Sequence, residues 1–211
     1  EAILALALLW GAALFYVSAG AVMTDMTLAV GTTLAMRGFW LGVYGDAPQR
    51  QRERWLFFLG LSIGLLAKGP MVLVLVGLPI VLWSLVTREV TAWRRLPWLP
   101  GGLIVVLLTL PWYVAAELKT PGFLNYFLLG EHWLRFTVTG WSGDRYGNAH
   151  AFARGSIWLF AVVASLPWTV LVLLLAYGRG KTGAPQTLTR PERDWRIYLL
   201  LWGLAPCLFF T

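Results

Sequence analysis

Long apolar runs separated by short polar stretches are the feature that most constrains this chain. A helix that crosses a bilayer needs about 20 mostly apolar residues, and several of the runs reach or approach that length. We therefore predict an all-α, polytopic transmembrane helix bundle that forms a single membrane-embedded domain over residues 1–211. The expected spans are 2–21, 27–44, 55–67, 70–86, 98–116, 156–177 and 197–211, with an exoplasmic segment at 117–155.

Composition supports this interpretation and excludes other classes of protein. Of the 211 residues, 58% are hydrophobic and 13% are charged, whereas soluble domains average about 45–50% apolar and about 25% charged residues. One cysteine, Cys207, excludes an internal disulfide framework. The net charge of +7 does not indicate nucleic acid, because the positive residues lie in short stretches between the apolar runs. We expect membrane lipids, and no nucleic acid, among the partners.

The distribution of Lys and Arg predicts the orientation of the chain. Eleven of these residues lie in one set of connecting stretches, 45–55, 88–97 and 178–196. Five lie in the alternate set, 22–26, 68–70 and 117–155. Positive residues concentrate on the cytoplasmic side of membrane proteins, so the first set is assigned to the cytoplasm and the second to the exoplasmic side. Arg37, inside a span, is expected to extend toward the inner interface.

A helix break with a lysine divides the 32-residue apolar run at 55–86. The sequence Ala67-Lys68-Gly69-Pro70 predicts the break, because Gly commonly ends a helix and Pro commonly begins one. The 13 residues before it would form a helix of about 20 Å, too short for the hydrocarbon core, which places Lys68 at head-group depth or deeper. A lysine beside a helix N-terminus is suited to phosphate. The alternative is a lysine that contacts lipid head groups.

A carboxylate occupies the tight turn between the first two spans. Asp25 lies in Met23-Thr24-Asp25-Met26-Thr27. In one interpretation Thr24 or Asp25 caps the following helix. In the other, Asp25 faces a site at the membrane surface, where ionisable groups are often functional. The pattern alone does not choose between them.

The exoplasmic segment carries the remaining candidate residues. Residues 121–136 form an amphipathic, aromatic-rich stretch that is typical of a helix lying in the membrane interface. Glu131, His132 and Arg135 lie within five residues, and His132 and Arg135 share a face of a continuing helix. They are either a metal ligand, an acid/base group and a phosphate-binding cation, or the polar face of an interfacial helix. Tyr146, in a turn-rich loop, either contacts a sugar or belongs to an exposed linker.

Two further observations complete the interpretation from residues alone. Gly60-x-x-x-Gly64 matches a helix-packing motif that is also common by chance in apolar runs. The chain begins with Glu1 on an apolar run and ends at Thr211 inside another. We interpret the sequence as an internal piece of a longer membrane protein.

A set of short motifs, in a fixed order, resembles a known family. The motifs are Thr24-Asp25-Met26-Thr27-Leu28, Leu66-Ala67-Lys68-Gly69-Pro70, Leu110-Pro111-Trp112-Tyr113, Pro121-Gly122-Phe123-Leu124-x-Tyr126-Phe127, Gly130-Glu131-His132-x-x-Arg135-Phe136, Ser165-Leu166-Pro167-Trp168 and Leu201-Trp202-x-x-x-Pro206-x-Leu208-Phe209-Phe210. In this order they resemble the aminoarabinose transferase and protein O-mannosyltransferase group of membrane glycosyltransferases. The resemblance extends over essentially the whole chain. It implies the GT-C fold, a bundle of transmembrane helices with catalytic loops on the exoplasmic side.

The resemblance also implies an activity. Members transfer a hexosyl or pentosyl sugar from a polyprenyl-phosphate donor to a lipid A-like or protein acceptor at the outer face of the bacterial inner membrane. A catalytic role is implied for Asp25, although Thr27 stands where proline is common, and a donor-phosphate role for Lys68, although Ala67 replaces the usual Thr. Arg135 is expected to bind the same phosphate, with Glu131, His132 and Tyr146 near the substrates. His132 corresponds to a histidine that holds a divalent metal in some relatives.

One departure from the family concerns its main acidic motif. The family carries an Asp-Glu pair followed by Arg-Tyr in the first exoplasmic loop, which we expect to lie before residue 1. The chain alone is therefore expected to be inactive. The alternatives are a transporter or flippase of lipid-linked sugars, a ligase that uses a diphosphate-linked oligosaccharide, and a non-catalytic scaffold. The sugar, the acceptor, metal dependence and oligomeric state do not follow from the sequence.

Overall fold

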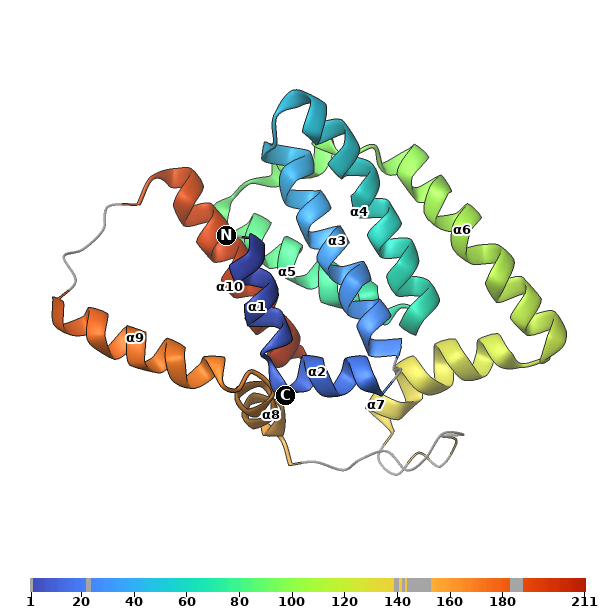
Figure 1. Ribbon diagram of the computed structural model, residues 1–211. Helices are drawn as coiled ribbons and strands as arrows, with labels where there is room; N and C mark the ends of the chain where they lie inside the picture. Colours follow the sequence, from blue (N-terminus) through green and yellow to red (C-terminus); the bar gives the residue numbers. More distant parts are fainter. Residues whose placement is uncertain (1, 22–23, 139–140, 142, 144–152, 183–187) are drawn as a thin grey trace. The chain divides into compact units, whose positions relative to one another are not determined.

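The computed structural model describes residues 2–21, 24–138, 141, 143, 153–182 and 188–211 (Figure 1). These residues form helices, turns and short irregular connections, and none of them lies in a strand. The all-α class predicted from the apolar runs is confirmed. The chain divides into two compact units, one made of residues 1–26 and 152–211 and the other of residues 27–151.

The unit of residues 27–151 contains the helix break and most of the described residues of the segment predicted to be exoplasmic. Its elements are α3 (Thr24–Tyr44), α4 (Ala47–Lys68), α5 (Met71–Thr87), the 3₁₀ helix η1 (Val90–Arg95), α6 (Trp98–Lys119), the π-helix η2 (Asn125–Leu134) and α7 (Arg135–Thr137). Helix α4 packs against both α5 and α6. Aromatic side chains pack together in the core of this unit. Phe39 and Trp83 are fully buried, and their ring centroids are 5.9 Å apart.

Small residues bring the backbones of α3 and α4 into contact. A Cβ atom on Gly60 would lie 2.5 Å from the main-chain nitrogen of Ala35, and one on Gly31 would lie 2.7 Å from the nitrogen of Gly64. Both distances are shorter than van der Waals contact, so only glycine fits at these crossings. The interpretation of Gly60-x-x-x-Gly64 as a packing motif is confirmed.

Helix α4 begins eight residues before the apolar run from which it was predicted. It starts after Asp46, has Pro48 in its first turn, and includes the basic stretch 47–54. Arg, Gln and Glu are good helix formers, so this polar stretch continues the helix. The 22 residues of α4 would be about 33 Å long at 1.5 Å per residue. The expected depth of Lys68 in the membrane rested on a helix of only 13 residues before it. Because α4 is longer, its length no longer supports that depth.

The other unit contains α1 (Ala2–Trp10), α2 (Ala13–Gly20), α8 (Ser156–Ala164), α9 (Trp168–Thr182) and α10 (Arg190–Phe209). Helix α2 contacts α8, and the main-chain N–H of Ala13 donates to the carbonyl of Leu166 at 3.0 Å. The predicted spans 2–21 and 156–177 are each interrupted by a bend. The bend is 75° between α1 and α2 and 91° between α8 and α9.

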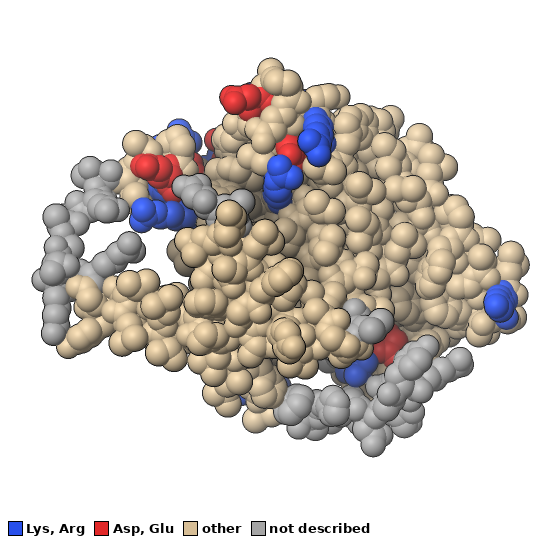
Figure 2. Space-filling view, in the orientation of Figure 1, with Lys and Arg blue, Asp and Glu red and all other residues tan. Residues whose placement is uncertain are grey.

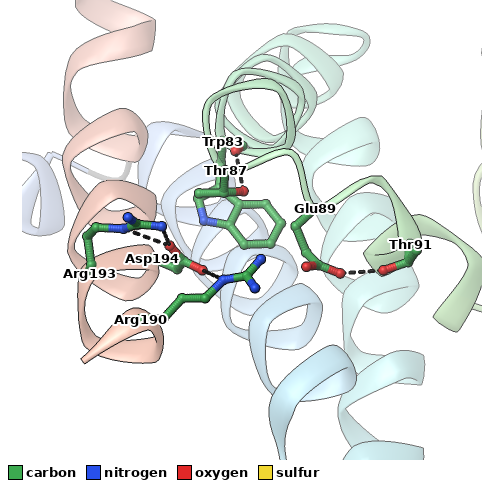
Figure 3. Close-up of polar contacts among 7 residues, drawn as sticks. All are labelled: Trp83, Thr87, Glu89, Thr91, Arg190, Arg193 and Asp194. Atoms are coloured by element: carbon green, nitrogen blue, oxygen red, sulfur yellow. Dashed lines mark hydrogen bonds and ion pairs between the residues drawn. The ribbon is translucent and has the colours of Figure 1, made fainter.

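Polar contacts fix the start of α10. Thr189 and Glu192 form a capping box, and the hydrogen bonds from the hydroxyl and the main-chain N–H of Thr189 lower the pKa of the Glu192 carboxyl. Figure 3 shows Asp194 accepting from Arg193 at 3.2 Å and facing Arg190 at 3.8 Å.

Two polar contacts lie near the end of α5, in the unit of residues 27–151. Figure 3 also shows them: the Thr87 hydroxyl donates to the Trp83 carbonyl at 2.7 Å, and the Thr91 hydroxyl donates to the Glu89 carboxylate.

Length and hydropathy identify one described helix that could cross a bilayer by itself, α6. The number of such segments rises to three if each of the two bent pairs is a single broken span. Helix α5 is apolar but has only 17 residues. Most of the face shown in Figure 2 is uncharged, and large apolar side chains such as Leu99 and Leu107 of α6 are exposed. The predicted number of membrane crossings stays a prediction.

Candidate functional site

The predicted break between α4 and α5 is confirmed, and a glycine makes it. Helix α4 ends at Lys68, and Gly69 follows with φ 63° and ψ −147°. This is a conformation that essentially only glycine adopts. The position is also crowded, since a Cβ atom on Gly69 would lie 2.6 Å from the ring of Phe127. Residue 69 is therefore restricted to glycine by its backbone conformation and by its neighbour.

The stretch predicted as an interfacial helix is helical, but residues 125–134 form a π-helix rather than an α-helix. In a π-helix, residues i and i+5 lie above one another. The Tyr126 hydroxyl accordingly donates to the Glu131 carboxylate. The Nδ1 atom of His132 lies 2.6 Å from the carbonyl oxygen of Phe127. π-Helical turns are rare and occur frequently at functional sites, which makes this segment a candidate independent of any motif.

His132 connects the π-helix to the helix break. Its Nε2 atom lies 2.9 Å from the carbonyl oxygen of Lys68, and its ring packs edge-on against Phe127 with 4.9 Å between the ring centroids. Both ring nitrogens thus face carbonyl oxygens. A neutral imidazole donates from one nitrogen only, so both contacts are hydrogen bonds only in the imidazolium form. The structure therefore brings the His132 ring to the main chain of Lys68, and the predicted roles of the two side chains stay predictions.

Glu131, the residue before His132, forms an ion pair with Arg135. Arg135 Nη1 lies 2.7 Å from Glu131 Oε2, and Glu131 Oε1 accepts from Tyr126. Both carboxylate oxygens are therefore occupied. We expected His132 and Arg135 to share a face, but His132 points to Lys68 while Arg135 is held by Glu131. Glu131 positions the Arg135 guanidinium. Its negative charge also offsets part of the attraction that Arg135 would exert on an anion.

Residues of α6 contact both α4 and the π-helix. The Tyr113 hydroxyl donates to the Leu65 carbonyl at 2.6 Å, and the Tyr113 ring lies 6.1 Å from that of Phe127. The Glu117 carboxylate accepts from the main-chain N–H groups of Gly122 at 2.8 Å and Leu124 at 2.7 Å. These bonds fix the turn that leads from α6 into the π-helix.

Asp25 and Tyr146 are the two predicted site residues that have no described contact with this group. Asp25 is in the first turn of α3, which begins at Thr24. Main-chain N–H groups at a helix N-terminus lack helical partners, so a carboxylate is favourable there. This placement fits the capping interpretation and leaves the catalytic one untested. Asp25 falls in the unit that includes residues 1–26, and Tyr146 lies outside the described residues.

The described residues do not fit a metal site at His132. Both ring nitrogens face main-chain carbonyls, and the Glu131 carboxylate is shared by Tyr126 and Arg135. No group of three or more His, Cys, Asp or Glu side chains is placed to hold a metal ion within the described part of the chain. The metal role of His132 stays a prediction from family resemblance, and no step below depends on it.

Tyr113, Tyr126 and Phe127 belong to the motifs that carry the resemblance, but none of them was assigned a role from the sequence. The proximity of Tyr113 to α4 depends on tertiary packing. Tyr126 and Phe127 contact Glu131 and His132 at a spacing of five residues. The 3.6-residue period of an α-helix places residues three or four apart together, so it could not reveal these pairs.

The fold belongs to a recognisable class of membrane protein. A crystal structure of ArnT from Cupriavidus metallidurans bound to undecaprenyl phosphate is similar over 95% of this chain and 38% of that protein. The TM-score is 0.67 and the identity 25%. The apo structure of the same protein gives a TM-score of 0.64 at 22% identity and shows the fold alone. The chain thus has the fold of a GT-C-type helix bundle, as its motifs predicted.

Sequence comparison identifies the family within that class. The pattern of the dolichyl-phosphate-mannose-protein mannosyltransferase family matches residues 1–127, and the chain belongs to this family. Two similar curated proteins are undecaprenyl phosphate-alpha-4-amino-4-deoxy-L-arabinose arabinosyl transferases. That of Pseudomonas fluorescens is 29% identical over 92% of this chain and 32% of its own length, and that of Sodalis glossinidius is 30% identical over 89% and 31%. The chain spans about a third of the length of these relatives.

Proposed function

We propose that the protein is an integral-membrane glycosyltransferase that moves a sugar from a polyprenyl-phosphate donor to a lipid A-like or protein acceptor. The observation that carries the proposal is the contact of His132 with the Lys68 carbonyl. It ties the segment that bears Arg135 to the helix break that bears Lys68. Two cations selected from the sequence as phosphate ligands thus lie in segments that contact one another.

The proposed donor follows from the names of the relatives. Those proteins are named for an undecaprenyl-phosphate-linked aminopentose, and the ArnT structure is described as bound to undecaprenyl phosphate. We propose a donor of the same class for this protein, a pentose or hexose joined through one phosphate to a polyprenyl chain. The proposed location is the bacterial inner membrane, with several membrane crossings and the active face on the periplasmic side.

The chemistry explains why cations are needed. The acceptor hydroxyl forms a bond to the anomeric carbon, the bond from that carbon to the phosphate oxygen breaks, and a carboxylate takes the proton. The donor phosphodiester carries one negative charge, and the departing polyprenyl phosphate carries a second in the transition state. Preorganised positive charge favours that transition state over the ground state. Lys68 and Arg135 would supply it, while Asp25 would orient the sugar or assist the base.

The test is sugar transfer by membranes that contain the full-length protein and a labelled polyprenyl-phosphate sugar. Wild type is compared with Lys68→Ala and, as a matched control, with Lys119→Ala. Both lysines lie in the last turn of a helix, and both are assigned to the exoplasmic side. We expect Lys68→Ala to lose about tenfold or more in transfer, the effect of one lost charge-assisted contact, and Lys119→Ala to retain it.

Each other outcome has a definite meaning. Equal loss in both variants would indicate general electrostatics and would remove Lys68 as the phosphate ligand. Transfer from a diphosphate-linked donor alone would indicate the ligase. Movement of the lipid-linked sugar across the membrane without product would indicate the flippase.

A further inference from the structure

Three arginines gather on the C-terminal end of α3, in the unit of residues 27–151. Arg54 Nε donates to the carbonyl of Gly42 at 3.0 Å, and Arg95 Nη1 donates to that of Val43 at 3.2 Å. Arg50 donates to the Gly45 carbonyl from Nε at 3.1 Å and from Nη2 at 2.9 Å. We refer to Arg50, Arg54 and Arg95 as the arginine cluster.

The positive charge of the cluster exceeds the negative charge around it. A helix C-terminus carries about half a negative charge, which is well below three positive ones. Within the described residues, no carboxylate forms an ion pair with a member of the cluster. Glu53, the neighbour of Arg54 in the chain, pairs with Arg37 at 2.7 Å. Burial lowers the pKa of Arg54, and repulsion by Arg50 and Arg95 lowers it further. Arg50 and Arg95 therefore lie close enough to Arg54 to repel it, and an anion would relieve that repulsion.

The cluster retains hydrogen-bond donors for such an anion. A guanidinium has five N–H donors, and the carbonyl contacts use one atom of Arg54, one of Arg95 and two of Arg50. Arg95 is exposed, and the other two are half-buried. The donors of a guanidinium form a rigid fork that matches the oxygens of a phosphate.

Aromatic side chains beside the arginine cluster indicate a membrane interface. Arg95 lies 5.9 Å from the centre of the Tyr44 ring, and the Tyr44 ring is 4.7 Å from that of Trp40. Trp93, also in η1, stacks on Trp98 with the ring centroids 5.5 Å apart. Tyr and Trp are enriched where head groups meet the hydrocarbon core. In Figure 2, charged side chains gather around the turn that joins α3 to α4, beside an uncharged surface.

We propose that the arginine cluster binds the phosphodiester head group of an anionic phospholipid. The leaflet is the one on the predicted cytoplasmic side, opposite the proposed donor site. Basic pockets between helices on that side are suited to acidic lipids. The adjacent rings favour a lipid over a soluble phosphate, because they can contact the glycerol backbone and the first methylene groups of the acyl chains.

The experiment measures lipid binding by the full-length protein in detergent. Native mass spectrometry follows titration with phosphatidylglycerol, phosphatidylcholine or inorganic phosphate. The cluster variant Arg50→Gln/Arg54→Gln/Arg95→Gln is compared with wild type. The control variant carries Gln at the other three arginines of the same stretches, Arg52, Arg88 and Arg94. All three are exposed, and the described structure gives them no hydrogen bond or ion pair.

Wild type is expected to prefer phosphatidylglycerol to phosphatidylcholine. The cluster variant should lose about tenfold more affinity for phosphatidylglycerol than the control variant, the factor that one charge-assisted hydrogen bond supplies. Equal losses, or no preference in wild type, would overturn the proposal. Displacement of the lipid by inorganic phosphate would assign the site to a soluble anion and would overturn the lipid as its ligand.

A second variant covers the case in which the cluster variant does not fold. Arg50→Lys/Arg54→Lys/Arg95→Lys keeps the charge and removes the guanidinium forks. We expect it to bind phosphatidylglycerol less tightly than wild type, because an ammonium is a point charge without the paired donors. Unchanged binding would contradict recognition by the forks.

Discussion

The imidazole of His132 lies 2.9 Å from the main-chain carbonyl oxygen of Lys68, across 64 residues of sequence. The contact holds a π-helix against a helix break. Each of these features is costly by itself, since a π-helix is a rare conformation and the break requires a glycine with positive φ. Their direct contact indicates that the fold retains them together, as expected for a site.

Removal of the His132 ring should weaken this connection. His132→Ala leaves the Lys68 carbonyl without its partner, so we expect a loss of about 1–2 kcal/mol in stability and a lower rate of sugar transfer. His132→Gln keeps one donor and should retain part of both. Thermal unfolding in detergent and the transfer assay measure the two effects. A fully stable and active His132→Ala protein would show that the contact is dispensable.

Substitution of Gly69 tests the break itself. Gly69→Ala places a Cβ atom 2.6 Å from the Phe127 ring at a residue with φ 63°. The strained backbone alone should cost about 1–3 kcal/mol, so the unfolding temperature should fall. Gly77→Ala is the matched control, because Gly77 is helical and nothing lies within 4 Å of its Cβ position. Similar unfolding temperatures for the two variants would contradict the restriction to glycine.

The sequence predicted the break and the packing motif because both are encoded locally. Gly69 and Pro70 are adjacent in the chain, and Gly60 and Gly64 recur one helical turn apart. The bonds that assemble the site depend instead on tertiary contacts. Neither the His132 contact with Lys68 nor the Tyr113 contact with Leu65 follows from spacing, since they join residues 64 and 48 positions apart. The start of α4 was predicted too late because apolarity, rather than helix propensity, defined the run.

Enlargement of Gly60 should separate α3 from α4. A Cβ atom on Gly60 would lie 2.5 Å from a main-chain nitrogen of α3, and a backbone atom cannot move aside as a side chain can. We expect Gly60→Ala to destabilise the protein by about 1–3 kcal/mol, the usual cost of overpacking. Chemical denaturation in mixed micelles measures it against Gly77→Ala. A neutral Gly60→Ala substitution would mean that the helices pack less closely than the structure shows.

Asp25 has two possible roles, a structural one at the start of α3 and the proposed catalytic one. As a helix-terminal carboxylate, Asp25 would contribute to stability through its negative charge. As a catalytic group, it would contribute to transfer. Asp25→Asn keeps the capping oxygen and removes the charge, so we expect normal membrane insertion and a loss of transfer of about a hundredfold, as for a general acid/base group. Unchanged transfer at matched expression would leave Asp25 with the capping role alone.

The ion pair between Arg37 and Glu53 offers a test by double-mutant cycle. Arg37 Nη2 lies 2.7 Å from Glu53 Oε1, and the two side chains are 49% and 2% exposed. Glu53 Oε2 is buried and has no hydrogen-bond partner in the described structure. Loss of Arg37 therefore leaves a buried carboxylate without its counter-charge. Because water reaches the half-exposed guanidinium, we expect Arg37→Met to cost about 2 kcal/mol, less than the 3–5 kcal/mol of a fully buried pair.

The double variant distinguishes charge pairing from simple loss of packing. Arg37→Met/Glu53→Leu removes both charges and replaces them with apolar groups, so it should be more stable than Arg37→Met alone. The two substitutions should therefore not be additive, with a coupling of about 1–2 kcal/mol in the free energy of unfolding. Additive effects would show that the pair does not hold α3 against α4. The carboxylate would then be retained for a reason that its contact with Arg37 does not explain.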